Sequence, residues 1–200
     1  MSAVAVIDSG LANIGSVVYA LQRLGVDPVV TCEAARIRSA SRVILPGVGA
    51  AGPAMARLRE AGLVEVLRTL SQPLLGICLG MQLLFERSAE GDVECLGLLR
   101  GRVARLSGEA GARVPHMGWN ALRDTRPAPL LVGIDDGAHA YFVHSYAVPV
   151  GECTLAACAH GEMFSAVVGD GRRFGAQFHP ERSSAVGAAL LRNFLQEVPA

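Results

Sequence analysis

Residues 74–82 read Leu74-Leu75-Gly76-Ile77-Cys78-Leu79-Gly80-Met81-Gln82. The apolar run predicts a buried strand over 74–77, and a helix is expected to follow over 79–87. A sharp turn from strand to helix strains its central residue and crowds the positions two residues away on either side. Glycine at both positions avoids a collision of side chains. The stretch therefore predicts that Cys78 stands at the carboxyl edge of a sheet, where the sites of α/β proteins lie.

Short apolar runs and helical patterns alternate on the N-terminal side of this turn. Strands are expected over 3–7, 28–31 and 42–45, with helices over 14–24 and 53–70. The second helix should be broken near Gly62. Alternation of strands and helices predicts an α/β fold with a mostly parallel central sheet and helices on both faces.

The pattern changes on the C-terminal side, where short strands are separated by turns rich in Gly and Pro. The expected strands cover 98–106, 119–122, 140–148, 154–159, 166–168 and 173–178. They favour an antiparallel or mixed extension of the sheet. A last helix, capped by Ser183 or Ser184, should bury Val186, Leu190, Leu191, Phe194 and Leu195. No linker or repeat interrupts the chain, so residues 1–200 are expected to form a single domain.

The composition excludes several classes of protein. The 18 basic residues, all of them Arg, balance 18 acidic residues, and no long basic run predicts binding to nucleic acid or a membrane surface. No apolar stretch approaches the ~20 residues of a membrane span, and the N-terminus does not resemble a signal peptide. The five cysteines are odd in number and irregularly spaced, which favours the reducing cytoplasm over a disulfide framework.

Cys78 is the cysteine whose surroundings predict chemistry. The amides at the start of the following helix would face its sulfur and favour the thiolate. The other cysteines are expected to be small buried hydrophobic residues: Cys32, Cys95, Cys153 and Cys158. The spacing of Cys153, Cys158 and His160 fits no common zinc pattern, so neither a metal nor a cofactor is expected.

A base for this thiol is expected at the end of the strand over 173–178. His179 can exchange a proton with the thiol, and Glu181 can orient the imidazole through its other nitrogen. Both would lie at the same sheet edge as Cys78. By contrast, no partner is evident for His116, His139 or His160, which are expected to be structural or exposed.

Residues 47–52 match the dinucleotide-binding pattern Gly-x-Gly-x-x-Gly. The match is weak, because it follows the third strand, Pro46 precedes it, and the acidic residue expected ~20 positions on would be Glu65 within a helix. A glycine-rich strand end that lets the backbone approach a substrate explains it better. Its amides would then face a developing oxyanion.

Three motifs together resemble the class I glutamine amidotransferases. They are Pro46-Gly47-Val48-Gly49, Gly76-Ile77-Cys78-Leu79-Gly80-Met81-Gln82 and Phe178-His179-Pro180-Glu181. Residues 114–120 and 141–146 look like the glutaminase subunits of imidazole glycerol phosphate synthases, and the resemblance extends from Val6 to Phe194. Glutaminases of other synthases, or a non-catalytic regulatory subunit on the same fold, are the alternatives.

The resemblance implies a role for each matching position. Cys78, His179 and Glu181 would form the triad that hydrolyses L-glutamine to glutamate and ammonia. Oxyanion and glutamine contacts would come from Gly47, Gly49, Leu79, Gln82, His144, Ser145 and Tyr146.

The resemblance also implies a second chain. Ammonia would pass to a (β/α)8-barrel cyclase subunit in a heterodimer, with Asn13 and Arg182 at the interface. The sequence departs from relatives near that interface, at Ser9, Ala12 and Arg182.

Overall fold

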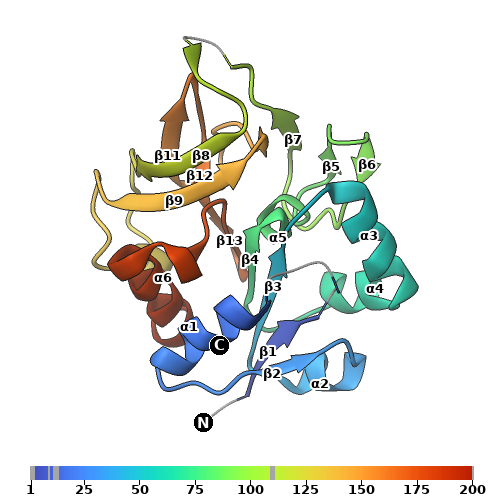
Figure 1. The fold of residues 1–200 in the computed structure, drawn as a ribbon. Helices are drawn as coiled ribbons and strands as arrows, with labels where there is room; N and C mark the ends of the chain where they lie inside the picture. The colour runs from blue at the N-terminus through green and yellow to red at the C-terminus, as the bar shows by residue number, and fades with distance from the viewer. Residues whose placement is uncertain (1–2, 9, 11–13, 109–110, 200) are drawn as a thin grey trace.

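The computed structural model describes residues 3–8, 10, 14–108 and 111–199. Its centre is a seven-stranded sheet in the order β11-β12-β13-β4-β3-β1-β2 (Figure 1). The parallel part comprises β1 (Val4–Ile7), β2 (Val29–Thr31), β3 (Arg42–Gly47), β4 (Leu74–Cys78) and β13 (Arg173–Ala176). Two antiparallel strands, β12 (Glu162–Asp170) and β11 (Thr154–His160), extend it. The predicted α/β fold with a mixed extension is confirmed.

Helices cover both faces of this sheet (Figure 1). One face packs against α1 (Ile14–Arg23) and α6 (Ser184–Gln196), and the other against α2 (Ala34–Ser39), α3 (Ala51–Glu60) and α4 (Leu63–Arg68). Side chains of β3 alternate between the two cores, because Ile44 joins the first while Val43 and Leu45 join the second. The parallel sheet is therefore buried on both sides, as its continuous apolar strands predicted.

The helix predicted over 53–70 is broken at Gly62, as expected, where φ is +66°. The helix predicted over 79–87 was too long, since α5 covers only Leu79–Gln82. Its continuation fails because the carbonyls of Leu83 and Leu84 accept hydrogen bonds from Leu96 and Leu98 instead of from a next helical turn. The short helix α2 was not expected.

Two smaller sheets lie beside the central one. One has the order β10-β7-β5-β6, with β5 (Arg87–Ser88), β6 (Val93–Glu94), β7 (Arg102–Arg105) and β10 (Tyr146–Ala147). The other small sheet consists of two strands, β8 (His116–Ala121) and β9 (His139–His144). Two short 3-10 turns are η2 (Pro129–Leu131) and η3 (Pro180–Arg182). The strand predicted over 140–148 is interrupted at Ser145, so that its halves join different sheets. The strand predicted over 98–106 shortens to β7.

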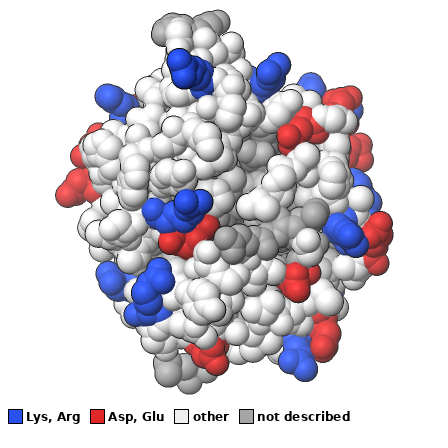
Figure 2. Space-filling model, viewed as in Figure 1, with Lys and Arg blue, Asp and Glu red and all other residues white. Residues whose placement is uncertain are grey.

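Charged side chains of both signs are interspersed around the face seen in Figure 2, in keeping with the balanced composition. Within the described residues, no helix combines the length and the apolar character needed to cross a membrane.

Candidate active site

Cys78 is the last residue of β4, and α5 begins at the next residue. Its backbone has φ of +52° and ψ of −112°, a strained conformation for a residue with a side chain. A Cβ atom added to Gly76 would lie 2.5 Å from the carbonyl oxygen of Gly80, and one added to Gly80 would lie 1.8 Å from that of Leu45. The crowding predicted from the sequence is confirmed, but the atoms that a side chain at either position would meet belong to the backbone, and not to other side chains as predicted.

His179 lies beside Cys78 because β13 and β4 are parallel neighbours, with Ala176 paired to Ile77. The imidazole lines the same cavity as Cys78, close enough for the charge of one group to affect the other, and its Nδ1 lies 2.8 Å from Oε1 of Glu181. The side chains of His179 and Glu181 are only 12% and 5% exposed. The structure thus brings the three predicted triad residues together in a site that is largely shielded from water.

Ser183 and α6 fix the backbone around this histidine. Ser183 occupies the N-cap position of α6, but its hydroxyl makes no cap hydrogen bond. It donates instead to the carbonyl of His179 at 2.7 Å and accepts the N–H of Tyr141 at 2.9 Å. The predicted capping role is therefore wrong. In its place, the hydroxyl ties the histidine to β9.

Opposing effects set the charge of His179. Burial disfavours the charged imidazole, but hydrogen bonds and charges of Cys78 and Glu181 outweigh burial and raise the pKa of His179 to about 10. The imidazolium is the stable form at neutral pH. It can therefore pair with a thiolate at Cys78 and later give a proton to a leaving group.

This pKa predicts how stability depends on pH. The folded pKa of His179 exceeds the unfolded value of about 6.5, so its stabilisation is complete below about pH 6.5 and is lost towards pH 10. In urea titrations between about pH 8.5, above which the thiol of an unfolded cysteine is also deprotonated, and about pH 10, the free energy of unfolding should fall more steeply for the unaltered chain than for His179→Asn. The variant is the control for all other titrating groups, and parallel curves would contradict the assignment.

A cavity of about 280 Å³ opens over the thiol. Most of the residues expected to bind glutamine line it: Gly49, Leu79, Gln82, His144, Ser145 and Tyr146, together with Cys78 and His179. Gly47 does not line it, although β3 places Gly47 beside Cys78. A Cβ atom on Gly47 would lie 2.8 Å from the amide nitrogen of Gly80, so this glycine makes room for the sharp turn from β4 to α5, here called the elbow.

The model of the family described as glutamine amidotransferase class-I matches residues 5–198. The chain belongs to the class-I glutamine amidotransferases. A protein named imidazole glycerol phosphate synthase subunit HisH from Xylella fastidiosa (strain Temecula1) is 62% identical over 196 residues, which are 98% of each chain. A protein of the same name from Xanthomonas euvesicatoria pv. vesicatoria is 63% identical with the same coverage.

Solved structures agree on the fold. A structure titled as a glutamine amidotransferase superposes with a TM-score of 0.75 at 22% identity, covering 97% of this chain and 98% of the other. PurLQS from Thermotoga maritima gives a TM-score of 0.69 at 18% identity, covering 100% of both chains. These similarities support the architecture of the amidotransferase domain alone, because their sequence identities are low.

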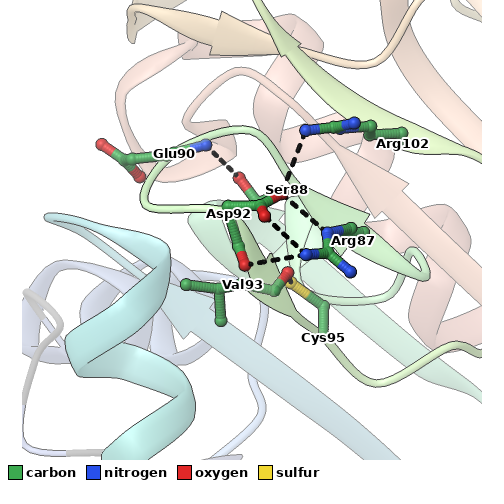
Figure 3. A network of polar contacts seen from close by, with 7 residues as sticks. All are labelled: Arg87, Ser88, Glu90, Asp92, Val93, Cys95 and Arg102. Atoms are coloured by element: carbon green, nitrogen blue, oxygen red, sulfur yellow. Dashed lines mark hydrogen bonds and ion pairs between the residues drawn. The ribbon is translucent and has the colours of Figure 1, made fainter.

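Sequence reasoning missed Glu90, which lines the cavity of this amidotransferase. It lies in the turn between β5 and β6, strands of two residues that leave no periodic pattern in the sequence. Figure 3 shows what holds this turn in place. Both carboxylate oxygens of Asp92 accept hydrogen bonds from Arg87, at 2.8 and 2.6 Å, and Oδ1 also accepts one from Arg102 at 3.1 Å. The Glu90 Oε2 atom accepts the N–H of Ala51 at the start of α3, at 2.9 Å.

The other histidines are structural or exposed, as expected, but two of them have partners that the sequence did not reveal. His116 is buried and its Nδ1 lies 3.0 Å from Nε2 of His144, while His160 Nε2 lies 2.7 Å from the carbonyl oxygen of Arg113. His139 is exposed, as expected. The pairing of His116 and His144 was not detectable in the sequence, because it depends on the register between β8 and β9.

The remaining cysteines do not share the properties of Cys78. Burial raises the pKa of Cys95 to about 11 and that of Cys158 to about 12, which makes both thiols inert at neutral pH. Cys153 is partly buried, and Cys32 is exposed, contrary to expectation. Among the described residues, no group of His, Cys, Asp and Glu side chains is arranged to hold a metal ion.

Of the two residues expected at a partner interface, the structure describes one. The Arg182 guanidinium lies over the ring of Tyr141, 4.8 Å from its centroid. Asn13 lies outside the described residues, as do Ser9 and Ala12.

Proposed function

We propose that this chain is the glutaminase subunit of imidazole glycerol phosphate synthase and hydrolyses L-glutamine to glutamate and ammonia. The observation that carries the proposal is the elbow thiol, which lines one cavity together with an imidazole that Glu181 holds at 2.8 Å. The relatives named HisH, which match nearly the whole chain, support this synthase over others.

The geometry supports a thioester mechanism. The sulfur of Cys78 forms a bond to the side-chain amide carbon of glutamine, and the C–N bond breaks as His179 gives its proton to the departing ammonia. Neutral His179 then takes a proton from water as its oxygen attacks the thioester; the C–S bond breaks, glutamate is released, and the thiolate and the imidazolium are restored. Backbone amides of Gly49 and Leu79, both at the cavity wall, are the proposed donors to the oxyanion.

Glu90 is the proposed contact for the α-ammonium group of glutamine. It supplies the only carboxylate among the described residues that line the cavity, and a substrate ammonium needs an anionic partner there. The hydrogen bond from the Ala51 N–H to Glu90 and the ion pairs of Asp92 fix the turn that carries Glu90, even without a bound substrate.

Glu90→Gln should therefore raise KM for glutamine by roughly tenfold or more, because a charge-assisted hydrogen bond becomes a neutral one. The amide oxygen can still accept from Ala51, so kcat should change less. Glu94→Gln, on the exposed side of the same hairpin, is the matched control and should leave KM unaltered. Equal KM values for the two variants would rule out this contact.

The proposed partner is a (β/α)8-barrel cyclase subunit, which would dock on an exposed pair of β8 residues, Met117 and Trp119, here called the β8 patch. Their side chains are 67% and 53% exposed, which is unusual for large apolar residues. Met117 pairs with Val143, which lines the cavity, so the patch adjoins the place where ammonia forms. Trp119 packs edge-on against Tyr141 at 5.9 Å.

The barrel would use the ammonia on a phosphoribulosyl-formimino ribonucleotide, yielding imidazole glycerol phosphate and an aminoimidazole carboxamide ribonucleotide. That reaction places the heterodimer among the lyases of histidine biosynthesis. A cytoplasmic location is part of the proposal, supported by the five cysteines, all of which are free thiols.

Trp119→Ala should weaken binding of the barrel subunit by roughly tenfold or more, because large aromatic residues dominate interface energies. The affinity can be measured by titrating the labelled chain with the barrel. Val30→Ala removes an exposed apolar side chain from the far edge of the sheet, on β2, and should bind normally. An unchanged affinity of Trp119→Ala would place the interface elsewhere.

The proposed function is tested by glutamate release from the purified chain with and without the barrel subunit and its nucleotide ligand. Slow release alone and much faster release with both additions are expected, since an uncoupled ammonia source would waste glutamine. Absence of release even with both would contradict a glutaminase and favour the regulatory alternative. Copurification with a different synthase would assign the chain to another pathway.

A further inference from the structure

A continuous series of hydrogen bonds begins at Asn120 in β8. The Asn120 Oδ1 atom accepts the N–H of Ala121 at 2.8 Å, and Nδ2 donates to the carbonyl of Ala159 at 2.9 Å. These two backbone partners fix which end of the amide is nitrogen. The same Nδ2 lies 3.2 Å from Nε2 of His116, which must therefore accept the second amide hydrogen.

This acceptor role determines the tautomers of two histidines. With Nε2 of His116 accepting, its proton is on Nδ1, which lies 3.0 Å from Nε2 of His144. That nitrogen accepts in turn, so His144 carries its proton on Nδ1 and donates to the carbonyl of Tyr146 at 2.9 Å. Because a carbonyl can only accept, the assignment from the Tyr146 end agrees with the assignment from Asn120.

Both histidines are neutral at physiological pH. Burial, reinforced by the nearby His144 and His160, lowers the pKa of His116 to about 3. Burial also lowers the pKa of His144 to about 4, with repulsion from His160 and His179 adding to it and the bond to Tyr146 opposing it. Charging either ring would replace an acceptor by a donor and break the series.

The series continues from Tyr146 to the nucleophile. Its carbonyl oxygen also accepts Nε2 of Gln82 at 2.8 Å, and the same Nε2 donates to Oε1 of Gln177 at 3.0 Å. Because Oε1 of Gln177 faces Gln82, the amide nitrogen of Gln177 points away from Gln82. This Nε2 lies 3.8 Å from Sγ of Cys78. The sulfur therefore faces an N–H donor at Gln177, while the carbonyl oxygen of Val143 lies 3.9 Å from it.

Buried polar groups are normally hydrogen-bonded, and this accounts for part of the arrangement. The side chains that link Asn120 to the sulfur are nearly inaccessible to water: His116, His144, Gln82 and Gln177. Burial does not account for the direction. Backbone groups at Asn120 and Tyr146 fix every donor and acceptor, and the last donor faces the reacting atom.

We propose that Gln177 is a positioning residue that donates an N–H to the sulfur of Cys78, and that the Tyr146 carbonyl sets the direction of this donation through Gln82. Neutral His116 and His144 form a second series that ends at the same carbonyl and holds it in place. The proposal rests on the function proposed above only in taking Cys78 as the nucleophile. His116 and Asn120 alternate along β8 with Met117 and Trp119, so the series begins on the opposite face of the strand from the β8 patch.

The tautomers are tested by NMR of the full chain labelled with ¹⁵N-histidine, at pH 7. His116 and His144, assigned by loss of their signals in single variants, should both be neutral with the proton on Nδ1, the less common tautomer of free histidine. A proton on Nε2 of either ring, or a charged ring, would overturn the role proposed for the two histidines, and the alkylation experiment below tests the donation from Gln177 separately. This measurement uses the unaltered chain and needs no substrate.

The donation to sulfur is tested by alkylation of Cys78 with iodoacetamide, followed by mass spectrometry of its peptide. Gln177→Met keeps the volume but removes the donor, so alkylation at pH 7 should slow by about tenfold. Gln72→Met removes a buried amide that bonds the Ile37 carbonyl on the far side of the elbow, and should alkylate at the normal rate. Normal alkylation of folded Gln177→Met would overturn the proposal.

These results separate the inference from the proposed function. Expected tautomers and alkylation rates in a chain that releases no glutamate would leave the hydrogen-bond series intact and refute the glutaminase. Active enzyme with the wrong tautomers would refute the series alone.

Discussion

Cys78→Ala should lower glutamate release by at least about a thousandfold, measured with the barrel subunit and its nucleotide ligand present. The expected loss is large because the sulfur forms the bond that replaces the amide, and Cys78 carries the only thiol among the described residues that line the cavity. His179 and Glu181 would remain in place without a nucleophile between them and the substrate. The folded state should survive, since alanine is smaller and meets the same backbone strain.

The matched control for this variant is Cys32→Ala, which removes an exposed thiol remote from the elbow. Its rate of glutamate release should equal that of the unaltered chain. Release by Cys78→Ala at a tenth or more of the normal rate would show that the nucleophile has been misassigned.

Gly80→Ala should destabilise the fold by about 3 kcal/mol, because the new methyl would lie 1.8 Å from the carbonyl oxygen of Leu45. The contact is with backbone, so relief requires β3 or the elbow to move. Movement of the elbow would also displace Cys78 from His179, and glutaminase activity should fall with stability. Urea unfolding monitored by circular dichroism measures the first effect.

Gly151→Ala is the control for the added methyl group. A Cβ atom there meets nothing within 4 Å, and the free energy of unfolding should change by less than about 0.5 kcal/mol. If Gly80→Ala were as stable as Gly151→Ala, the tight packing assigned to the elbow would be wrong.

The parts of the site that were predictable from sequence lie where steric limits or the end of a strand leave few possible residues or positions. Gly76 and Gly80 mark the elbow because no other residue fits their positions. His179 and Glu181 follow directly from the end of β13, which parallel pairing places beside β4. The central sheet was predictable for the same reason, since buried parallel strands are continuous apolar runs.

The residues that escaped prediction depend on contacts between distant segments. Glu90 reaches the cavity on a hairpin whose strands have two residues each, too few for a pattern. His116 acquires its partner only through the pairing of β8 with β9. The end of α5 at Gln82 is set by hydrogen bonds from residues 96–99, which local helix propensity does not reveal.

The most direct test of the central claim is mass spectrometry of the chain quenched in acid during turnover of glutamine. The mechanism predicts a glutamyl adduct on the peptide that contains Cys78, formed in the complex with the barrel subunit and absent from Cys78→Ala. An adduct on a different cysteine, or steady glutamate release by a chain lacking Cys78, would contradict it.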